Sequence, residues 1–260
     1  MKAIELTGRV ALVTGATGQL GRTMVRNLAQ CGADVAICYL SQKDFALALQ
    51  KEVQDTYGVK ALAVQADVTE MDSVTKMKQE VNASLGTVDI IVNNAHASVY
   101  WETVMDQPLE DYDTEYRTCV LHSVIMSKAF VPDMIKQGYG RVIATNSECS
   151  MQMFPYQSAY ASGKRGMDGI YKVLAREVGP HGITVNQVAP GWTISDGCRD
   201  ADGSEMNWRQ DFVYIDQVPL RRRGTDEDIA NAVCFLASDL AAFISGVYLP
   251  VCGANVMPCI

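Results

Sequence analysis

The feature that most constrains this chain is a regular alternation between short, β-branched apolar runs and longer stretches with helical periodicity. The apolar runs predict seven buried strands, at residues 10–13, 34–39, 60–65, 88–92, 141–145, 183–188 and 247–251. The stretches between them predict helices, at about residues 20–29, 44–57, 71–85, 109–135, 158–178 and 226–238. Strands that are apolar on both faces and alternate with helices predict a parallel sheet with right-handed crossovers. We therefore expect an α/β fold, with a doubly wound, seven-stranded parallel sheet and helices on both faces.

Length and charge narrow the class of protein. The 260 residues include 48% hydrophobic and 20% charged residues, which is ordinary for a globular chain, so we expect one domain over residues 1–260. The formal net charge of −8 argues against nucleic acid as a partner, because phosphate binding needs the opposite sign. No continuous apolar run approaches the roughly 20 residues of a membrane span, and no signal peptide is visible. The expectation is a cytoplasmic protein without membrane contact.

Cysteines and histidines are the candidate metal ligands. The eight cysteines are scattered, mostly within apolar stretches, and form no C-x-x-C pair, so we expect reduced, buried thiols. His96, His122 and His181 are far apart and show no metal-ligand spacing. The sequence therefore predicts no metal site.

A glycine-rich segment follows the first predicted strand and opens the first predicted helix. Residues 14–21 read T-G-A-T-G-Q-L-G. Glycines let the backbone approach a pyrophosphate, whose charge meets free N–H groups at the helix N-terminus. A tight strand-to-helix turn is the alternative, but the place in the first βα unit favours a dinucleotide site. The candidate residues are Gly15, Thr17, Gly18, Gln19, Leu20 and Gly21.

Polar residues also follow later strands, where ligands of doubly wound sheets bind. Asp67 and Val68 follow the third strand and Asn94 follows the fourth. Each alone is typical of a solvated loop or a helix cap. Because they share the carboxyl edge of the sheet, we expect them to contact one common ligand.

A further group of residues predicts proton-transfer chemistry. Tyr160 and Lys164 are four residues apart on a predicted helix, so they share one face, and Ser147 follows the fifth strand. A nearby ammonium stabilises a phenolate and lowers its pKa, which suits proton exchange with an alcohol or carbonyl oxygen. A tyrosine and a lysine at this spacing are common on helix surfaces. The combination with Ser147 and the glycine-rich segment favours a catalytic site.

Together these motifs resemble those of the short-chain dehydrogenase/reductase family, in its shorter-chain branch with Asn-Asn-Ala, Ser and Tyr-x-x-x-Lys motifs. The resemblance extends from Gly8 to Gly253 and includes Pro190-Gly191. It implies a Rossmann-type domain and hydride transfer at a carbonyl or hydroxyl carbon. Tyr160 would be the acid/base, Ser147 would orient the substrate oxygen, and Lys164 would hold the nicotinamide ribose and depress the tyrosine's pKa. The implied cofactor contacts, beyond those above, are Tyr39, Tyr160, Lys164, Pro190, Gly191, Thr193 and Ser195.

Two departures from the family pattern concern the cofactor. The middle glycine of the loop usually falls at Gln19, whereas here it is Gly18; pyrophosphate binding should survive, because backbone N–H groups do the binding. Tyr39 stands where many NAD-dependent members have an acid, which would repel a phosphate. The absence of that acid, together with the nearby Ser41 and Lys43, modestly favours NADP(H) over NAD(H).

Two more departures concern the chemistry. Cys119 falls at the position of the usual active-site asparagine, whose backbone carbonyl holds a water in the family's proton relay; in another helix register Ser123 takes that position. Cys119 keeps the carbonyl and loses the amide. His96 replaces the usual glycine after Asn-Asn-Ala, where an imidazole would border the substrate or form a hydrogen-bonded loop.

The substrate is expected under a lid at about residues 192–218, with His96, Met153 and Trp192 among its contacts. The apolar and aromatic residues there favour a secondary alcohol/ketone that is hydrophobic or cyclic. The leading interpretation is therefore an NAD(P)-dependent oxidoreductase acting on such a pair. The alternatives are a ketoacyl-thioester reductase and, from a different class, a non-catalytic dinucleotide-sensing protein. The resemblance also implies a homotetramer, joined through the long helices and the C-terminal strand.

Overall fold

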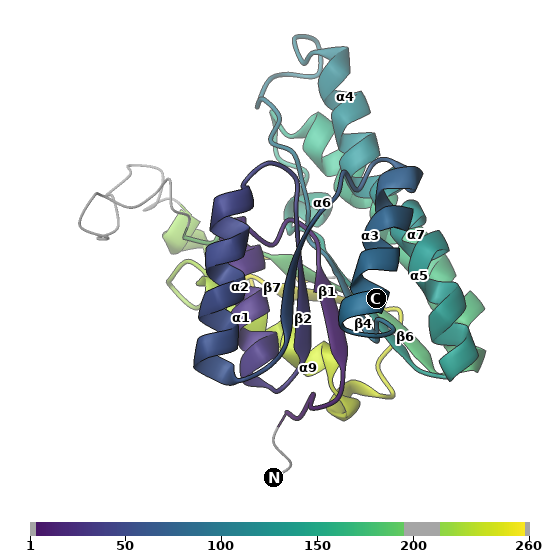
Figure 1. Cartoon of the computed structure of the whole chain (residues 1–260). Coiled ribbons are helices and arrows are strands. Elements are labelled where there is room, and N and C mark those ends of the chain that lie inside the picture. The colour runs from purple at the N-terminus through teal and green to yellow at the C-terminus, as the bar shows by residue number, and fades with distance from the viewer. Residues whose placement is uncertain (1–3, 195–213, 258–260) are drawn as a thin grey trace.

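The computed structural model describes residues 4–194 and 214–257. Seven strands form one parallel sheet in the order β3-β2-β1-β4-β5-β6-β7 (Figure 1). Their bounds are β1 Val10–Val13, β2 Asp34–Tyr39, β3 Ala61–Gln65, β4 Ile90–Asn93, β5 Gly140–Thr145, β6 Ile183–Pro190 and β7 Tyr248–Val251. The chain crosses from β3 at one edge to β4 beside β1, which is the topological switch of a doubly wound fold. The predicted seven-stranded parallel sheet is confirmed.

Helices cover both faces of the sheet, as the sequence predicts (Figure 1). One face carries α1 Gln19–Gln30, α2 Lys43–Tyr57 and α9 Asp226–Ala237, and the other α3 Met71–Ser84, α5 His122–Gln137 and α7 Ser158–Val178. The shorter elements are α4 Leu109–Glu115, the π-helix η1 Tyr116–Leu121, α6 Cys149–Gln152 and the 3₁₀ turns η2 Gly179–His181 and η4 Asp239–Ala241.

Alternate residues of a strand pack into two separate hydrophobic cores, one on each face of the sheet. Ala11 and Val13 of β1 pack with α1 and α9, whereas Val10 and Leu12 pack with the helices of the other face. Burial of a valine or leucine side chain contributes about 1.5–3 kcal/mol to the stability of the fold. Because the strands bury such side chains on both faces, they hold the two helical layers against the sheet. β6 extends two residues beyond its predicted end, because Ala189 and Pro190 pair with Pro250 and Val251.

The long helix expected at 109–135 is interrupted. α4 and α5 are joined by the six-residue π-helix η1, which carries Cys119. The stretch Leu109–Gln137 has the length and hydropathy of a membrane span, but half of the relevant window is buried inside the protein. Met126, Phe130 and Met134 pack against the sheet and against α3 and α7. The stretch is therefore a core helix.

The loops after β1 and β4 are tied together at the switch point. The Thr14 hydroxyl accepts hydrogen bonds from the backbone N–H groups of Asn94 (2.9 Å) and Ala95 (3.0 Å). Gly15 has φ +60°, and a Cβ there would lie 2.7 Å from the Ala95 Cα. Only glycine permits this approach of the two loops. The carboxyl edge of the sheet is thereby shaped into a rigid platform.

Candidate active site

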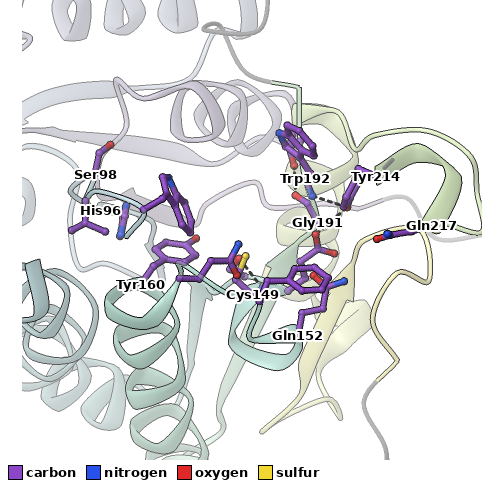
Figure 2. Close-up of a pocket in the computed structure, with 16 residues that line it drawn as sticks. His96, Ser98, Cys149, Gln152, Tyr160, Gly191, Trp192, Tyr214 and Gln217 are labelled. Atoms are coloured by element: carbon purple, nitrogen blue, oxygen red, sulfur yellow. Dashed lines mark hydrogen bonds between the residues drawn. The ribbon is translucent and has the colours of Figure 1, made fainter. Parts of the chain in front are cut away.

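Two adjoining cavities lie at the carboxyl ends of the strands. One, of about 660 Å³, runs along the glycine-rich segment and the ends of β2, β3 and β4. The other, of about 850 Å³, is bordered by the ends of β5 and β6 and by the start of α7. His96 lines both. Figure 2 shows the larger cavity, with His96 and Tyr160 on one side and Trp192 and Tyr214 on the other.

The smaller cavity has the features of a phosphate site. It is lined by Gly15, Thr17, Gly18, Gln19 and Leu20, all predicted cofactor residues. Gly18 caps α1 and makes no side-chain hydrogen bond to it, and the N-terminus of a helix is a favourable place for an anion. Gly21 does not line the cavity. A Cβ at Gly21 would lie 2.8 Å from the Ala16 Cα, so this glycine serves the close packing of helix on loop.

Four more predicted cofactor residues line the same cavity: Tyr39, Asp67, Val68 and Asn94. The Asp67 carboxylate accepts from Thr69 N (2.9 Å) and Oγ1 (2.7 Å), which shapes the turn after β3. The Asn94 amide donates to the carbonyl oxygens of Thr14 (3.2 Å) and Gly15 (3.3 Å). Asn94 therefore holds the glycine-rich segment in place. These residues fit a dinucleotide at the switch point.

Of the predicted cofactor residues at and after the end of β6, those that the structure describes do not line the smaller cavity. Gly191 and Thr193 line the larger cavity, and Pro190 is the last residue of β6. Ser195 lies outside the described residues. Gln19, where the family usually has glycine, donates from Nε2 to the Ile194 carbonyl and to Asp226 Oδ1 (2.6 Å). Its side chain links the glycine-rich segment to the chain beyond β6.

Ser147, Tyr160 and Lys164 come together at the end of β5. Ser147 and Tyr160 both line the larger cavity, and Ser147 lowers the pKa of the Tyr160 hydroxyl. The Lys164 Nζ lies 5.7 Å from the centroid of the Tyr160 ring and donates to the Thr145 carbonyl (2.8 Å). Lys164 is buried, as expected for an amine held beneath the phenol.

Burial determines the direction in which the pKa of Tyr160 is shifted. Burial raises the pKa of Tyr160 above its ordinary value, while Lys164 and Ser147 lower it by less. The lowered pKa expected from Lys164 alone is thus outweighed in the protein without ligands, although the sign of the lysine's effect is as predicted. For Lys164, burial lowers the pKa, but Cys119, Tyr160 and Glu115 together raise it above its ordinary value.

Cys119 lies in η1 beside this group, and its backbone carbonyl has a partner. The Ser123 hydroxyl donates to the Cys119 carbonyl at 2.6 Å, so one of the two lone pairs expected to serve a relay water is taken. The Cys119 thiol donates to Glu115 Oε2 at 3.3 Å. Burial raises the pKa of this thiol to about 11.

His96 is positioned by a carboxylate that sequence reasoning missed. Its Nε2 lies 2.8 Å from Glu115 Oε1, and its ring meets the Tyr160 ring edge-on at 5.2 Å. Glu115 is fully buried, although the surrounding D-Y-D-T-E sequence is typical of a solvated helix face. Gly163 on α7 makes room for it, because a Cβ at Gly163 would lie 2.9 Å from Glu115 Oε2.

The substrate side of the site agrees only in part with expectation. Trp192 and His96 line the larger cavity, whereas Met153 is 56% exposed and does not line it. Met153 caps α6 in a left-handed conformation, and its neighbour Phe154 lines the cavity in its place. Of the predicted lid at 192–218, residues 195–213 lie outside the described residues.

A buried carboxylate also forms part of the cavity wall. Glu148 accepts from the Tyr214 hydroxyl (3.0 Å) and from Asn255 Nδ2 (3.0 Å), and the Tyr214 hydroxyl accepts from Trp192 N (2.8 Å). Burial raises the pKa of Glu148. No sequence motif marks it, because its partners come from distant segments.

Comparison with known proteins agrees with this fold. A family model described as enoyl-(acyl carrier protein) reductase matches residues 15–253. The chain belongs to the short-chain dehydrogenase/reductase family, which confirms the predicted resemblance. It is an NAD(P)-dependent oxidoreductase of the kind that acts on CH–OH or keto groups.

Individual relatives match over nearly the whole chain. A 3-oxoacyl-(acyl-carrier-protein) reductase FabG of Staphylococcus epidermidis is 36% identical, covering 95% of this chain and 98% of its own. The FabG of Escherichia coli is 35% identical, covering 98% and 100%. A solved short-chain dehydrogenase/reductase variant of Serratia marcescens has 30% identity, a TM-score of 0.85 and coverage of 96% and 98%. A putative short-chain alcohol dehydrogenase of Sinorhizobium meliloti has 28% identity, a TM-score of 0.88 and coverage of 98% of both chains.

Proposed function

We propose that this protein catalyses reversible hydride transfer between a nicotinamide cofactor and a secondary alcohol/ketone pair, with a hydrophobic or cyclic substrate. The observation that carries the proposal is the position of Tyr160 and Ser147. Both line a cavity of about 850 Å³ that adjoins the groove along the glycine-rich segment. A substrate oxygen beside these hydroxyls has its carbon close to that groove.

The residues divide the work. The nicotinamide, when bound, supplies or accepts the hydride. In the reductive direction the Tyr160 hydroxyl donates a proton to the oxygen of the substrate carbonyl, and in the oxidative direction the phenolate accepts it. The Ser147 hydroxyl donates a hydrogen bond to the same oxygen. Lys164, held by the Thr145 carbonyl, favours the phenolate electrostatically and is placed to contact the ribose.

The cavity wall favours an apolar or cyclic substrate. Trp101, Phe154 and Trp192 supply aromatic surface around Tyr160. Among the described lining residues there is no lysine or arginine, so an anionic group at this place would lack a permanent cation. Ser98, Gln152 and Gln157 add uncharged polar groups that suit a hydroxyl or a second carbonyl.

Reduction of a ketoacyl thioester is the second candidate, favoured by the two FabG relatives. No lysine or arginine is among the described lining residues, so a phosphate-bearing arm of a carrier protein would find no cation within this part of the cavity. A panel separates the two: cyclic and aryl ketones, the matching alcohols, and a 3-oxoacyl thioester, each followed at the nicotinamide absorbance band. Turnover of the thioester alone would contradict our first choice. Binding of cofactor with no turnover of any substrate would favour the dinucleotide-sensing alternative.

We propose NADP(H) as the preferred cofactor. Near the end of β2 the cavity is lined by Tyr39, Ser41 and Gln42. None of these side chains is a carboxylate, so none would repel the 2′-phosphate of NADP(H). Fluorescence titration with NADPH and NADH separately tests this choice. Tighter binding of NADPH is expected, and tighter binding of NADH would contradict it.

We also propose a cytoplasmic homotetramer. The six described cysteines are free thiols, as suits a reducing compartment. β7 is an edge strand, and Phe243, between η4 and β7 in the chain, is fully exposed. An exposed edge and an exposed aromatic side chain are features that a second copy of the chain covers.

A further inference from the structure

Three potential metal ligands converge behind the Tyr160 ring. His96 Nε2 lies 2.8 Å from Glu115 Oε1, and Cys119 Sγ lies 3.3 Å from Glu115 Oε2. One nitrogen, one oxygen and one sulfur of these residues all lie within 4.8 Å of one another. We name them the His96–Glu115–Cys119 cluster. The sequence did not reveal it, because His96 comes from the loop after β4 and the other two from a distant helix.

The three donors suit one class of cation. Imidazole nitrogen, carboxylate oxygen and thiolate sulfur form the ligand set of borderline-soft divalent ions, whereas Mg²⁺ and Ca²⁺ prefer oxygen alone. We propose that His96, Glu115 and Cys119 bind a divalent transition metal of the zinc type. Three protein ligands leave one tetrahedral position for water or another small donor.

The distances between the donors are close to those a metal requires. Tetrahedral zinc with bonds of about 2.0–2.3 Å separates its ligand atoms by about 3.3–3.6 Å. The His96 Nε2–Glu115 Oε1 pair at 2.8 Å must open by about half an ångström and the Cys119 Sγ–Glu115 Oε2 pair at 3.3 Å by about 0.3 Å, each pair using a different oxygen of Glu115, while His96 and Cys119 lie within 4.8 Å of each other. Metal binding displaces both shared protons: the thiol proton passes to solvent, and the imidazole changes tautomer, so that it loses its proton from Nε2 and takes one up on Nδ1.

Charge and burial also favour a cation here. Glu115 is fully buried, Cys119 is 2% exposed, and His96 keeps 23% of its side chain exposed toward the cavities. A buried carboxylate is costly unless a positive charge neutralises it. The carboxylate and a thiolate together balance a divalent ion, so the occupied site is neutral despite the nearby Lys164. His96 provides the path of entry from the cavity.

The backbone around the cluster is built to hold it. Cys119 lies in the π-helix η1, a kind of irregularity that often occurs at functional sites. Glu115 precedes η1, and Gly163 on α7 leaves the space that the carboxylate occupies. Glu115 and Cys119 are therefore positioned by α4 and η1, which pack against α7, and His96 reaches them from the loop after β4.

Cobalt(II) is the probe that tests this site without reference to turnover. Titration of the purified protein with Co²⁺ alone is expected to give the intense visible bands of tetrahedral cobalt and a near-ultraviolet thiolate-to-cobalt band, both displaced by Zn²⁺. Cys119→Ser should lose the thiolate band, and His96→Gly should weaken binding by more than about tenfold. A wild-type protein without a thiolate band, or a band that survives in Cys119→Ser, would overturn the proposal.

A second thiol pair supplies the matched control. Cys31, at the C-terminal end of α1, and Cys234, in α9, are neighbouring thiols that line neither cavity. Cys31→Ser should leave the cobalt spectrum unchanged, and loss of the spectrum in this variant would place the metal elsewhere and contradict us. Far-ultraviolet circular dichroism checks the fold of each variant. If Cys119→Ser does not fold, Glu115→Gln, which keeps the shape of the side chain, is expected to abolish tetrahedral cobalt binding, and retained binding would refute the site.

Discussion

At the scale of the residue, spacing along one helix predicts proximity well, whereas burial of a charge does not show in the sequence. Tyr160 and Lys164 meet because residues four apart share a helix face, and the structure brings the amine within 5.7 Å of the ring centroid. Glu115 and Glu148 escaped prediction because their burial depends on partners from distant segments, such as His96 and Asn255. For the same reason the effect of burial on the pKa of Tyr160 was not foreseen.

Removing the Lys164 charge should move the pH dependence of oxidation. Lys164 lowers the pKa of Tyr160, so Lys164→Met is expected to raise it further. Alcohol oxidation needs the phenolate, so the rising limb of kcat/KM against pH should shift to higher pH, with a lower maximum. The measurement is a pH–rate profile of both proteins. An unshifted limb would show that Lys164 does not act on the proton-transferring group.

His122 should make stability depend on acid pH. Burial lowers its pKa from 6.5 to about 4, so the folded protein holds it neutral while the unfolded chain protonates it below about pH 6.5. Its contribution is present above pH 6.5 and is lost as the pH falls toward 4, at no more than about 1.4 kcal/mol per pH unit. His122→Gln should flatten the pH dependence of urea unfolding in this window. The exposed His181→Gln is the control, and equal slopes in all three proteins would contradict the assignment.

At the scale of the element, periodicity predicts most of the architecture and misses its irregularities. All seven strands lie within two residues of their predicted bounds, because short apolar runs rich in β-branched residues strongly favour buried strands. The π-helix η1 was not predicted, since the apolar pattern from α4 to α5 continues through it. Its position depends on tertiary contacts with α7 rather than on local preference.

Two glycines on α7 give a matched test of this packing. A Cβ at Gly163 would lie 2.9 Å from Glu115, whereas a Cβ at Gly169 meets nothing within 4 Å. Gly163→Ala should destabilise the protein by about 1–3 kcal/mol, and Gly169→Ala should stabilise it by about 0.5–1 kcal/mol. Chemical denaturation of both variants measures the difference. Equal effects would mean that α4 and η1 are not held against α7 as described.

At the scale of the whole molecule, the alternation of strands and helices was sufficient to predict the sheet, while assembly requires surfaces that the sequence does not mark. Val173 on α7 is 57% exposed, and β7 ends the sheet.

Sedimentation equilibrium should give four times the 28.4 kDa of one chain. Val173→Glu should reduce that mass, and Leu47→Glu on α2 should not. A wild-type mass of 28.4 kDa would contradict the tetramer.

The central claim is that the Tyr160 hydroxyl carries the transferred proton, and the most direct measurement compares Tyr160→Phe with the wild type. The variant removes one oxygen and keeps the ring against His96 and Trp101. We predict a loss of kcat of at least about 100-fold, with cofactor affinity by fluorescence titration within a few-fold of wild type. Unchanged turnover in the variant would contradict the claim.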